Sequence, residues 1–171
     1  MDYLQIRDST PLSSWELKCV ERLKSLLTPA DSYTFLSIPD CRNILDTLKY
    51  SDEARFRWLS GRPQGVYVDT DCYLNELFIP ANDCKCYFPM NYLAKYIDIF
   101  YIIVNGNINF IQKNFTNGYI SGEYYGWPPE ELQNLTNDKI GYIPEKVYNH
   151  SYKTFTNFYQ SQRRAKCLKL I

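Results

Sequence analysis

Residues 99–127 read IFYIIVNGNINFIQKNFTNGYISGEYYGW, and this stretch predicts the sheet of the protein. The run from Ile99 to Val104 is rich in β-branched and aromatic residues, which favour strands. Asn105-Gly106 and Asn117-Gly118 follow two of the strand-like runs, and Asn-Gly pairs favour the positive backbone angles of two-residue hairpin turns. Three such runs joined by two turns predict an antiparallel meander near residues 99–126.

The sequence before the meander predicts short helices and one further strand. Ser13 and Glu16 have the spacing of a capping box, although Thr10-Pro11 offers an alternative helix start. Apolar residues at helical spacing follow, and shorter helices are expected over residues 31–36, 40–50, 51–61 and 90–96. Alternation from Val66 to Ile79 predicts a long or broken strand. The apolar positions of the first helix are Trp15, Cys19, Val20, Leu23, Leu26 and Leu27.

The end of the chain predicts another helix. Aromatic residues recur there at intervals of three and four, which is typical of the packed face of an amphipathic helix. The predicted fold class is therefore α+β, with an antiparallel sheet of about four to five strands and helices on one face. We expect a single domain over residues 1–171, with a helical part at 1–62, a sheet part at 64–126, and helices over 128–171. The C-terminal stripe comprises Tyr148, Tyr152, Phe155, Tyr159 and Gln162.

Composition narrows the class of protein. Of 171 residues, 45% are hydrophobic and 22% charged, which is average for a folded globular chain. The 19 basic side chains balance the 19 acidic ones, so no overall field attracts nucleic acid or an anionic membrane. The N-terminus lacks a secretory signal, and no apolar run approaches the roughly 20 residues that span a bilayer. These features predict a cytoplasmic, tyrosine-rich protein.

Charge is nevertheless segregated along the chain. Residues 65–138 hold 3 basic and 9 acidic side chains, whereas residues 139–171 hold 7 and 1. The acidic group is open to three interpretations: solvated charge on an exposed sheet face, a surface for a basic protein partner, or a metal site. The basic group is also open to three interpretations: it complements a helix dipole, contacts the phosphates of a nucleic-acid partner, or pairs within the chain with the acidic middle. The acidic group is Asp69, Asp71, Glu76 and Asp83, and the basic group is Arg163, Arg164, Lys166 and Lys169.

A third candidate binding region is aromatic. Tyr124, Tyr125 and Trp127 precede two prolines, and rigidly held aromatic side chains lose little freedom when they bind a partner. If the cluster is buried, it closes the end of the sheet instead. If the three side chains are exposed, we predict that they contact the partner.

Several common motifs of catalytic and cofactor-binding sites are absent from the sequence. The chain has no nucleophile elbow, no phosphate-cradling glycine-rich loop and no His-Glu-x-x-His. Cys84-Lys-Cys86 is the one close cysteine pair, and a zinc site commonly needs two. The single histidine, His150, is interpreted as a surface residue or cap neighbour at the start of the last helix. No catalytic residue, resident metal or cofactor is therefore expected.

These observations favour a non-enzymatic binding protein that masks a partner macromolecule by protein–protein interaction. A bacterial toxin immunity protein and a phage-encoded inhibitor of host defence are of this kind. The expected partner is a protein, with nucleic acid less favoured and no membrane contact; the sequence gives no oligomeric state. Two alternatives stay open: a metal-dependent enzyme acting on nucleic acid through Asp69 and Asp71, and a structural or oligomerising component.

Overall fold

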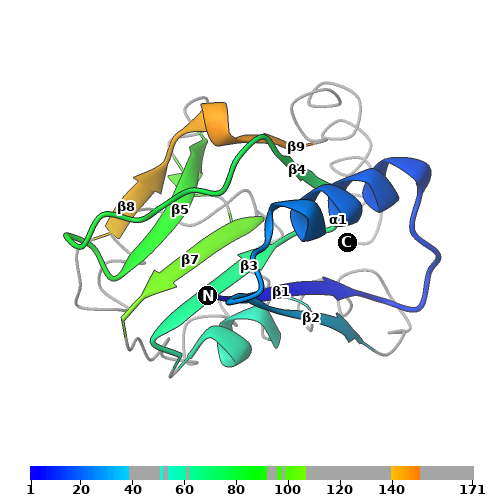
Figure 1. Ribbon diagram of the computed structural model, residues 1–171, viewed down its shortest axis with the longest axis horizontal. Helices are drawn as coiled ribbons and strands as arrows, with labels where there is room; N and C mark the ends of the chain where they lie inside the picture. Colours follow the sequence, from blue (N-terminus) through cyan, green and yellow to red (C-terminus); the bar gives the residue numbers. More distant parts are fainter. Residues whose placement is uncertain are drawn as a thin grey trace, which may run out of the picture.

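The protein is built around a mixed β-sheet, and Figure 1 shows its labelled strands side by side. The computed structural model describes residues 1–38, 51, 54–60, 62–91, 96–97, 99–106 and 140–150. Among these residues, seven strands form one sheet in the order β2-β1-β3-β7-β5-β6, with β8 paired to β5. The strands are β1 (Asp2–Arg7), β2 (Ser32–Ser37), β3 (Gln64–Val68), β5 (Cys86–Asn91), β6 (Tyr96–Ile97), β7 (Tyr101–Asn105) and β8 (Ile140–Ile143).

Parallel pairing dominates the first half of this sheet. Strand β1 pairs in parallel with β2 on one side and with β3 on the other, aligning Leu4 with both Thr34 and Tyr67. Strand β7 then runs antiparallel to β3 and β5, while β8 is again parallel to β5. Because β1 and β3 point the same way, their carboxyl ends meet at one edge of the sheet.

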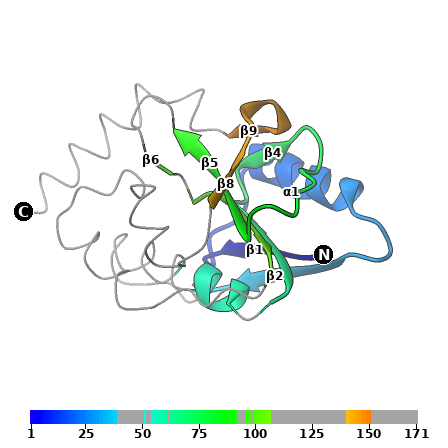
Figure 2. The ribbon, with the colours of Figure 1, turned by 90° about the vertical axis from the view of Figure 1, so that its left-hand side faces the viewer.

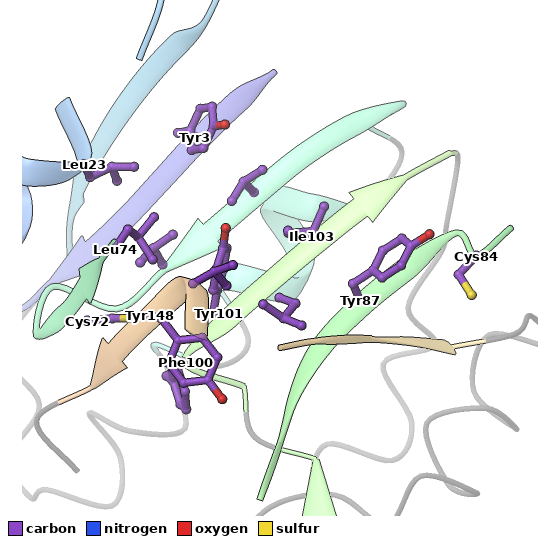
Figure 3. Close-up of a cluster of buried hydrophobic side chains, with 14 residues drawn as sticks. Tyr3, Leu23, Cys72, Leu74, Cys84, Tyr87, Phe100, Tyr101, Ile103 and Tyr148 are labelled. Atoms are coloured by element: carbon purple, nitrogen blue, oxygen red, sulfur yellow. The ribbon is translucent and has the colours of Figure 1, made fainter. Parts of the chain in front are cut away.

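Helices cover both faces of the sheet, as Figure 2 shows. A helix over residues 54–59 packs Phe56 and Leu59 against Leu4 and Tyr67 on one face. On the other face, α1 (Ser14–Leu26) packs Leu23 into a second core, which Figure 3 shows in close-up. That second core also contains residues of β4 (Cys72–Leu74), η2 (Glu145–Val147) and β9 (Tyr148–His150), with β4 and β9 forming a separate antiparallel pair.

Helix α1 begins where its capping box predicts. The Ser13 hydroxyl accepts a hydrogen bond from the Glu16 backbone N–H at 3.2 Å, and the Glu16 carboxylate accepts one from the Ser13 N–H at 2.8 Å. These two bonds satisfy amide groups that have no partner within the helix. The sequence predictions of this helix, of a helix after residue 51 and of a strand from Ile99 are confirmed over the described residues.

The predicted fold class is wrong. The sheet is mixed rather than antiparallel, and residues 2–7 and 32–37 are strands although the N-terminal third was expected to be helical. Pairing with β1 along the whole of β2 satisfies backbone groups that a short helix leaves open. Residues 90–91 also belong to a strand, β5, instead of a helix. The continuation of the meander over 107–126 and the helical stripe beyond residue 150 lie outside the described residues.

Two further expectations concern the chain as a whole. No helix in the described part of the chain has the length and apolar character needed to cross a bilayer. The cytoplasmic compartment and the single domain stay predictions.

Replacing Leu23 by alanine tests the packing of α1. Leu23 is completely buried, so Leu23→Ala removes buried methyl groups and leaves a cavity, which typically costs about 2–5 kcal/mol of unfolding free energy. Leu17 lies on the same helix but is exposed, so Leu17→Ala is expected to change stability by less than about 0.5 kcal/mol. Denaturant unfolding of both variants measures the difference, and equal losses would contradict the placement of this helix.

Candidate functional site

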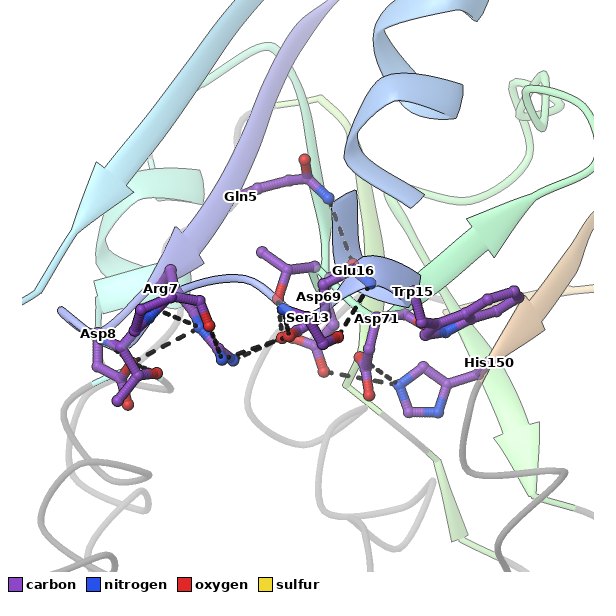
Figure 4. A network of polar contacts seen from close by, with 12 residues as sticks. Gln5, Arg7, Asp8, Ser13, Trp15, Glu16, Asp69, Asp71 and His150 are labelled. Carbon is purple, nitrogen blue, oxygen red and sulfur yellow. Dashed lines mark hydrogen bonds and ion pairs between the residues drawn. The ribbon is translucent and has the colours of Figure 1, made fainter. Parts of the chain in front are cut away.

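Three side chains with metal-ligating atoms converge beyond the carboxyl end of β3. Asp69, Asp71 and His150 each place one ligand atom within 4.8 Å of the others. His150 Nε2 lies 3.0 Å from Asp71 Oδ1 and 3.9 Å from Asp69 Oδ2. Figure 4 shows the three side chains pointing toward one another. They form the candidate site, called here the Asp-Asp-His cluster.

The topology explains how His150 reaches two residues about eighty positions earlier in the chain. Asp69 follows the last residue of β3, and Asp71 directly precedes β4. Strand β9 pairs antiparallel with β4 so that His150 lies opposite Cys72. The imidazole also stacks on the Phe100 ring, with centroids 4.1 Å apart and an angle of 13° between the planes. The ring is therefore fixed on one face by packing and along one edge by Asp71.

The turn that carries the two carboxylates is held by its backbone. The Asp69 N–H donates to the Phe100 carbonyl at 2.7 Å, and the Cys72 N–H closes a turn on the Asp69 carbonyl at 3.1 Å. The Gln5 side chain on β1 also donates to that carbonyl, at 3.3 Å. Because these bonds hold both ends of the turn over residues 69–72, the Asp69 and Asp71 side chains leave the backbone in fixed directions.

The start of α1 supports the same turn from the other side. The Trp15 indole N–H donates to the Asp71 carbonyl at 3.0 Å, and the Thr70 hydroxyl donates to the Glu16 carboxylate at 3.2 Å. Glu16 is buried and also pairs with Arg7 at 2.6 Å. The carboxylate of the capping box therefore connects the helix start, the end of β1 and the turn, as Figure 4 shows.

The cluster concentrates negative charge in a partly buried place, which is energetically unfavourable. Burial raises the pKa of Asp69 above its usual range; Arg55 opposes the shift, the Asp71 carboxylate adds to it, and His150 opposes it. Two carboxylates in one partly buried place repel each other. A cation between them relieves both the repulsion and the burial cost.

The donor set fits a divalent cation. Carboxylate oxygens suit Mg²⁺ and Mn²⁺, and imidazole nitrogen is a ligand of most divalent transition metals. Neighbouring ligands about 2.1 Å from one octahedral cation lie about 3 Å apart, which is close to the separation of His150 Nε2 and Asp71 Oδ1. Three protein ligands leave coordination positions for a substrate. The carboxylates are 27% and 35% exposed, so an ion from solvent reaches them.

The structure divides the predicted acidic group. Asp69 and Asp71 enter the cluster, whereas Glu76 and Asp83 are exposed on the segment between β4 and β5 and are not part of it. Asp83 accepts a hydrogen bond from the Tyr87 hydroxyl at 3.0 Å. The aromatic candidates Tyr124, Tyr125 and Trp127 lie outside the described residues. The basic candidates lie outside them too: Arg163, Arg164, Lys166 and Lys169.

Sequence reasoning missed the role of His150. The interpretation of His150 as a surface residue is wrong, because His150 ends β9 and its side chain is 8% exposed. The alternative, a neighbour of a helix cap, depends on residues after 150 that lie outside the described residues. The alternation of buried Tyr148, exposed Asn149 and buried His150 is a strand pattern that indicates an inward-facing imidazole. No sequence pattern indicates that this strand pairs with β4.

The fold is similar to one solved in a galactosyltransferase. No family model matches the chain, and no curated protein matches it in sequence. A crystal structure of the galactosyltransferase LgtC in complex with donor and acceptor sugar analogues superposes with a TM-score of 0.52 at 9% identity, over 85% of this chain and 74% of that one. A glycosyltransferase involved in glycosylation of the major capsid of PBCV-1 superposes with a TM-score of 0.47 at 10% identity, over 83% and 79%.

This likeness corrects the predicted function. The shared fold is one solved in glycosyltransferases, so the prediction of a non-enzymatic inhibitor, such as an immunity protein, is wrong. The likeness supports neither of the alternatives, a nucleic-acid enzyme or a structural component. The error arose because the function was inferred from the lack of common catalytic motifs and from the segregation of charge along the chain. The buried histidine that completes the cluster comes from a distant strand.

Proposed function

We propose that this chain is a metal-dependent glycosyltransferase that takes a sugar from a phosphate-activated donor and transfers it to an acceptor hydroxyl. The observation that carries the proposal is the Asp-Asp-His cluster, which gathers two carboxylates and an imidazole beside each other. The likeness in fold to a galactosyltransferase solved with donor and acceptor sugar analogues supports the choice of reaction.

The place of the cluster in the sheet supports a substrate site. In sheets with parallel strands, ligands bind beyond the carboxyl ends of those strands. The cluster lies there, since Asp69 follows β3 and β3 is parallel to β1. Arg7 and Asp8, at the end of β1, lie at the same edge of the sheet.

The chemistry of glycosyl transfer matches this donor set. The bond between the anomeric carbon and a phosphate oxygen breaks, and its electron pair stays on the phosphate. A new bond forms between the anomeric carbon and the acceptor oxygen, whose proton passes to solvent or a base. A bound divalent cation supplies stabilisation of the negative charge that the leaving phosphate gains.

The residues of this chain have distinct roles in that reaction. Asp69 Oδ2, Asp71 Oδ1 and His150 Nε2 would hold the cation. The hydrogen bonds from Gln5 and Trp15 keep the turn rigid, so the ligands need not reorganise when the donor arrives. Phe100 excludes water from one face of the imidazole.

Donor cleavage tests the proposal without knowledge of the acceptor, because water replaces the acceptor in a slow side reaction. The purified protein is incubated with Mn²⁺ and a panel of nucleoside diphosphate sugars, and release of nucleoside diphosphate is measured. We expect release from at least one donor, and loss of that release when EDTA removes the cation. A folded protein that binds Mn²⁺ and cleaves none of the donors would overturn the proposal.

A further inference from the structure

The two oxygens of the Asp69 carboxylate have different surroundings. Oδ1 accepts a hydrogen bond from the Tyr67 hydroxyl and lies 3.5 Å from Arg55 Nη1. Oδ2 is the oxygen that faces His150, at 3.9 Å. Oδ1 is therefore held by Tyr67 and Arg55, and Oδ2 is directed into the cluster.

Tyr67 and Arg55, which contact Asp69 Oδ1, are themselves fixed by contacts in the core. Tyr67 is 1% exposed on β3, and the Arg55 guanidinium lies over its ring, 4.2 Å from the centroid. Arg55 comes from the helix over residues 54–59, which packs on the face of the sheet opposite α1. Its Nη1 donates to the Ile99 carbonyl at 2.8 Å, and its Nη2 donates to the Ser51 hydroxyl at 3.1 Å. Neither side chain can move without breaking contacts in the core.

We propose that Tyr67 is a positioning residue, supported by Arg55, which fixes the Asp69 carboxylate so that Oδ2 is presented to the cation. The inference rests on the cation site of the proposed function and extends it to the residues behind the ligands. Tyr67 touches neither the cation nor the donor in this account; it acts through Asp69.

Loss of the Tyr67 hydroxyl is expected to weaken metal binding measurably. Ligating carboxylates are hydrogen-bonded by groups that fix their orientation, and loss of such a group typically weakens metal binding about 10–100-fold. Without the Tyr67 hydroxyl, the Asp69 carboxylate has fewer contacts that keep Oδ2 directed toward His150.

Mn²⁺ binding to the donor-free protein tests the inference, with the free ion counted by electron paramagnetic resonance. Tyr67→Phe removes only the hydroxyl and keeps the ring under Arg55, so the variant is expected to fold. We expect its Kd for Mn²⁺ to rise about tenfold or more. Tyr87→Phe is the matched control: it also removes a hydrogen-bonded hydroxyl from a buried tyrosine, but on β5 and outside the cluster. Its Kd is expected to stay within about twofold of the unmodified protein.

The outcomes separate this inference from the proposed function. If the unmodified protein binds Mn²⁺ and Tyr67→Phe binds it equally well, the positioning role is wrong while the cation site stands. If the unmodified protein binds no Mn²⁺, both are wrong. A rise in Kd in both variants, in step with a lowered melting temperature, would assign the effect to general stability and overturn the inference.

Discussion

Replacing Asp71 by asparagine is expected to lower the rate of donor cleavage by more than about 100-fold, beyond the effect typical of a group that only supports a ligand. The substitution keeps the size and the planar shape of the side-chain group but removes its charge. Asp71 Oδ1 is the carboxylate oxygen nearest to His150 Nε2, at 3.0 Å. An amide oxygen is a weaker ligand, and the leaving phosphate loses the cation that stabilises it. Release of nucleoside diphosphate under saturating donor measures the effect.

A matched control distinguishes a cation site from an acidic surface. Glu76 belongs to the same acidic run of the sequence but is exposed and outside the cluster. Glu76→Gln removes one negative charge, as Asp71→Asn does, and is expected to leave the rate of cleavage unchanged. Similar losses in the two variants would indicate that overall negative charge, and not coordination, is what matters.

Replacing His150 by phenylalanine is expected to weaken Mn²⁺ binding by more than about tenfold, since one of three protein ligands is lost. A phenyl ring preserves the stacking on Phe100, so the packing at this position is kept while the ligand nitrogen disappears. The Kd for Mn²⁺, measured by calorimetry, reports the change.

Tyr148→Phe serves as the comparison for His150→Phe. Tyr148 lies two residues away on the same strand and is also buried, but it contributes no ligand atom to the cluster. We expect its Mn²⁺ affinity to stay close to that of the unmodified protein. If the two variants bind Mn²⁺ with the same affinity, the imidazole is not a ligand and the cluster is reduced to two carboxylates.

Local signals in the sequence predicted local structure well. The spacing of Ser13 and Glu16 identified the start of α1, because a capping box satisfies backbone groups within four residues. The β-rich run from Ile99 predicted a strand that the structure shows as β7. Both signals depend only on neighbours in the chain.

Pairing between distant segments was not predictable in the same way. Residues 32–37 form β2 because β1 offers a complete parallel ladder, and nothing within those six residues specifies a parallel partner. The first strand was missed for the same reason. The order of the strands decides which loops share an edge of the sheet, so an error in pairing becomes an error about the site.

The candidate site shows this most clearly. The sequence singled out Asp69 and Asp71, since two acids after an apolar strand are visible in a single line of residues. It did not assign a role to His150, which joins them only through the pairing of β9 with β4. The positioning contacts from Tyr67 and Arg55 depend on three elements meeting, so local patterns contain no sign of them.

In the proposed reaction, the Asp-Asp-His cluster holds a divalent cation to which the phosphates of a sugar donor bind. Anomalous diffraction from crystals grown with Mn²⁺ and a nucleoside diphosphate locates the ion directly. We expect one strong peak within coordination distance of Asp69, Asp71 and His150, with diphosphate oxygens completing the coordination shell of the ion. A nucleotide bound elsewhere, or a cluster without a manganese peak, would contradict it.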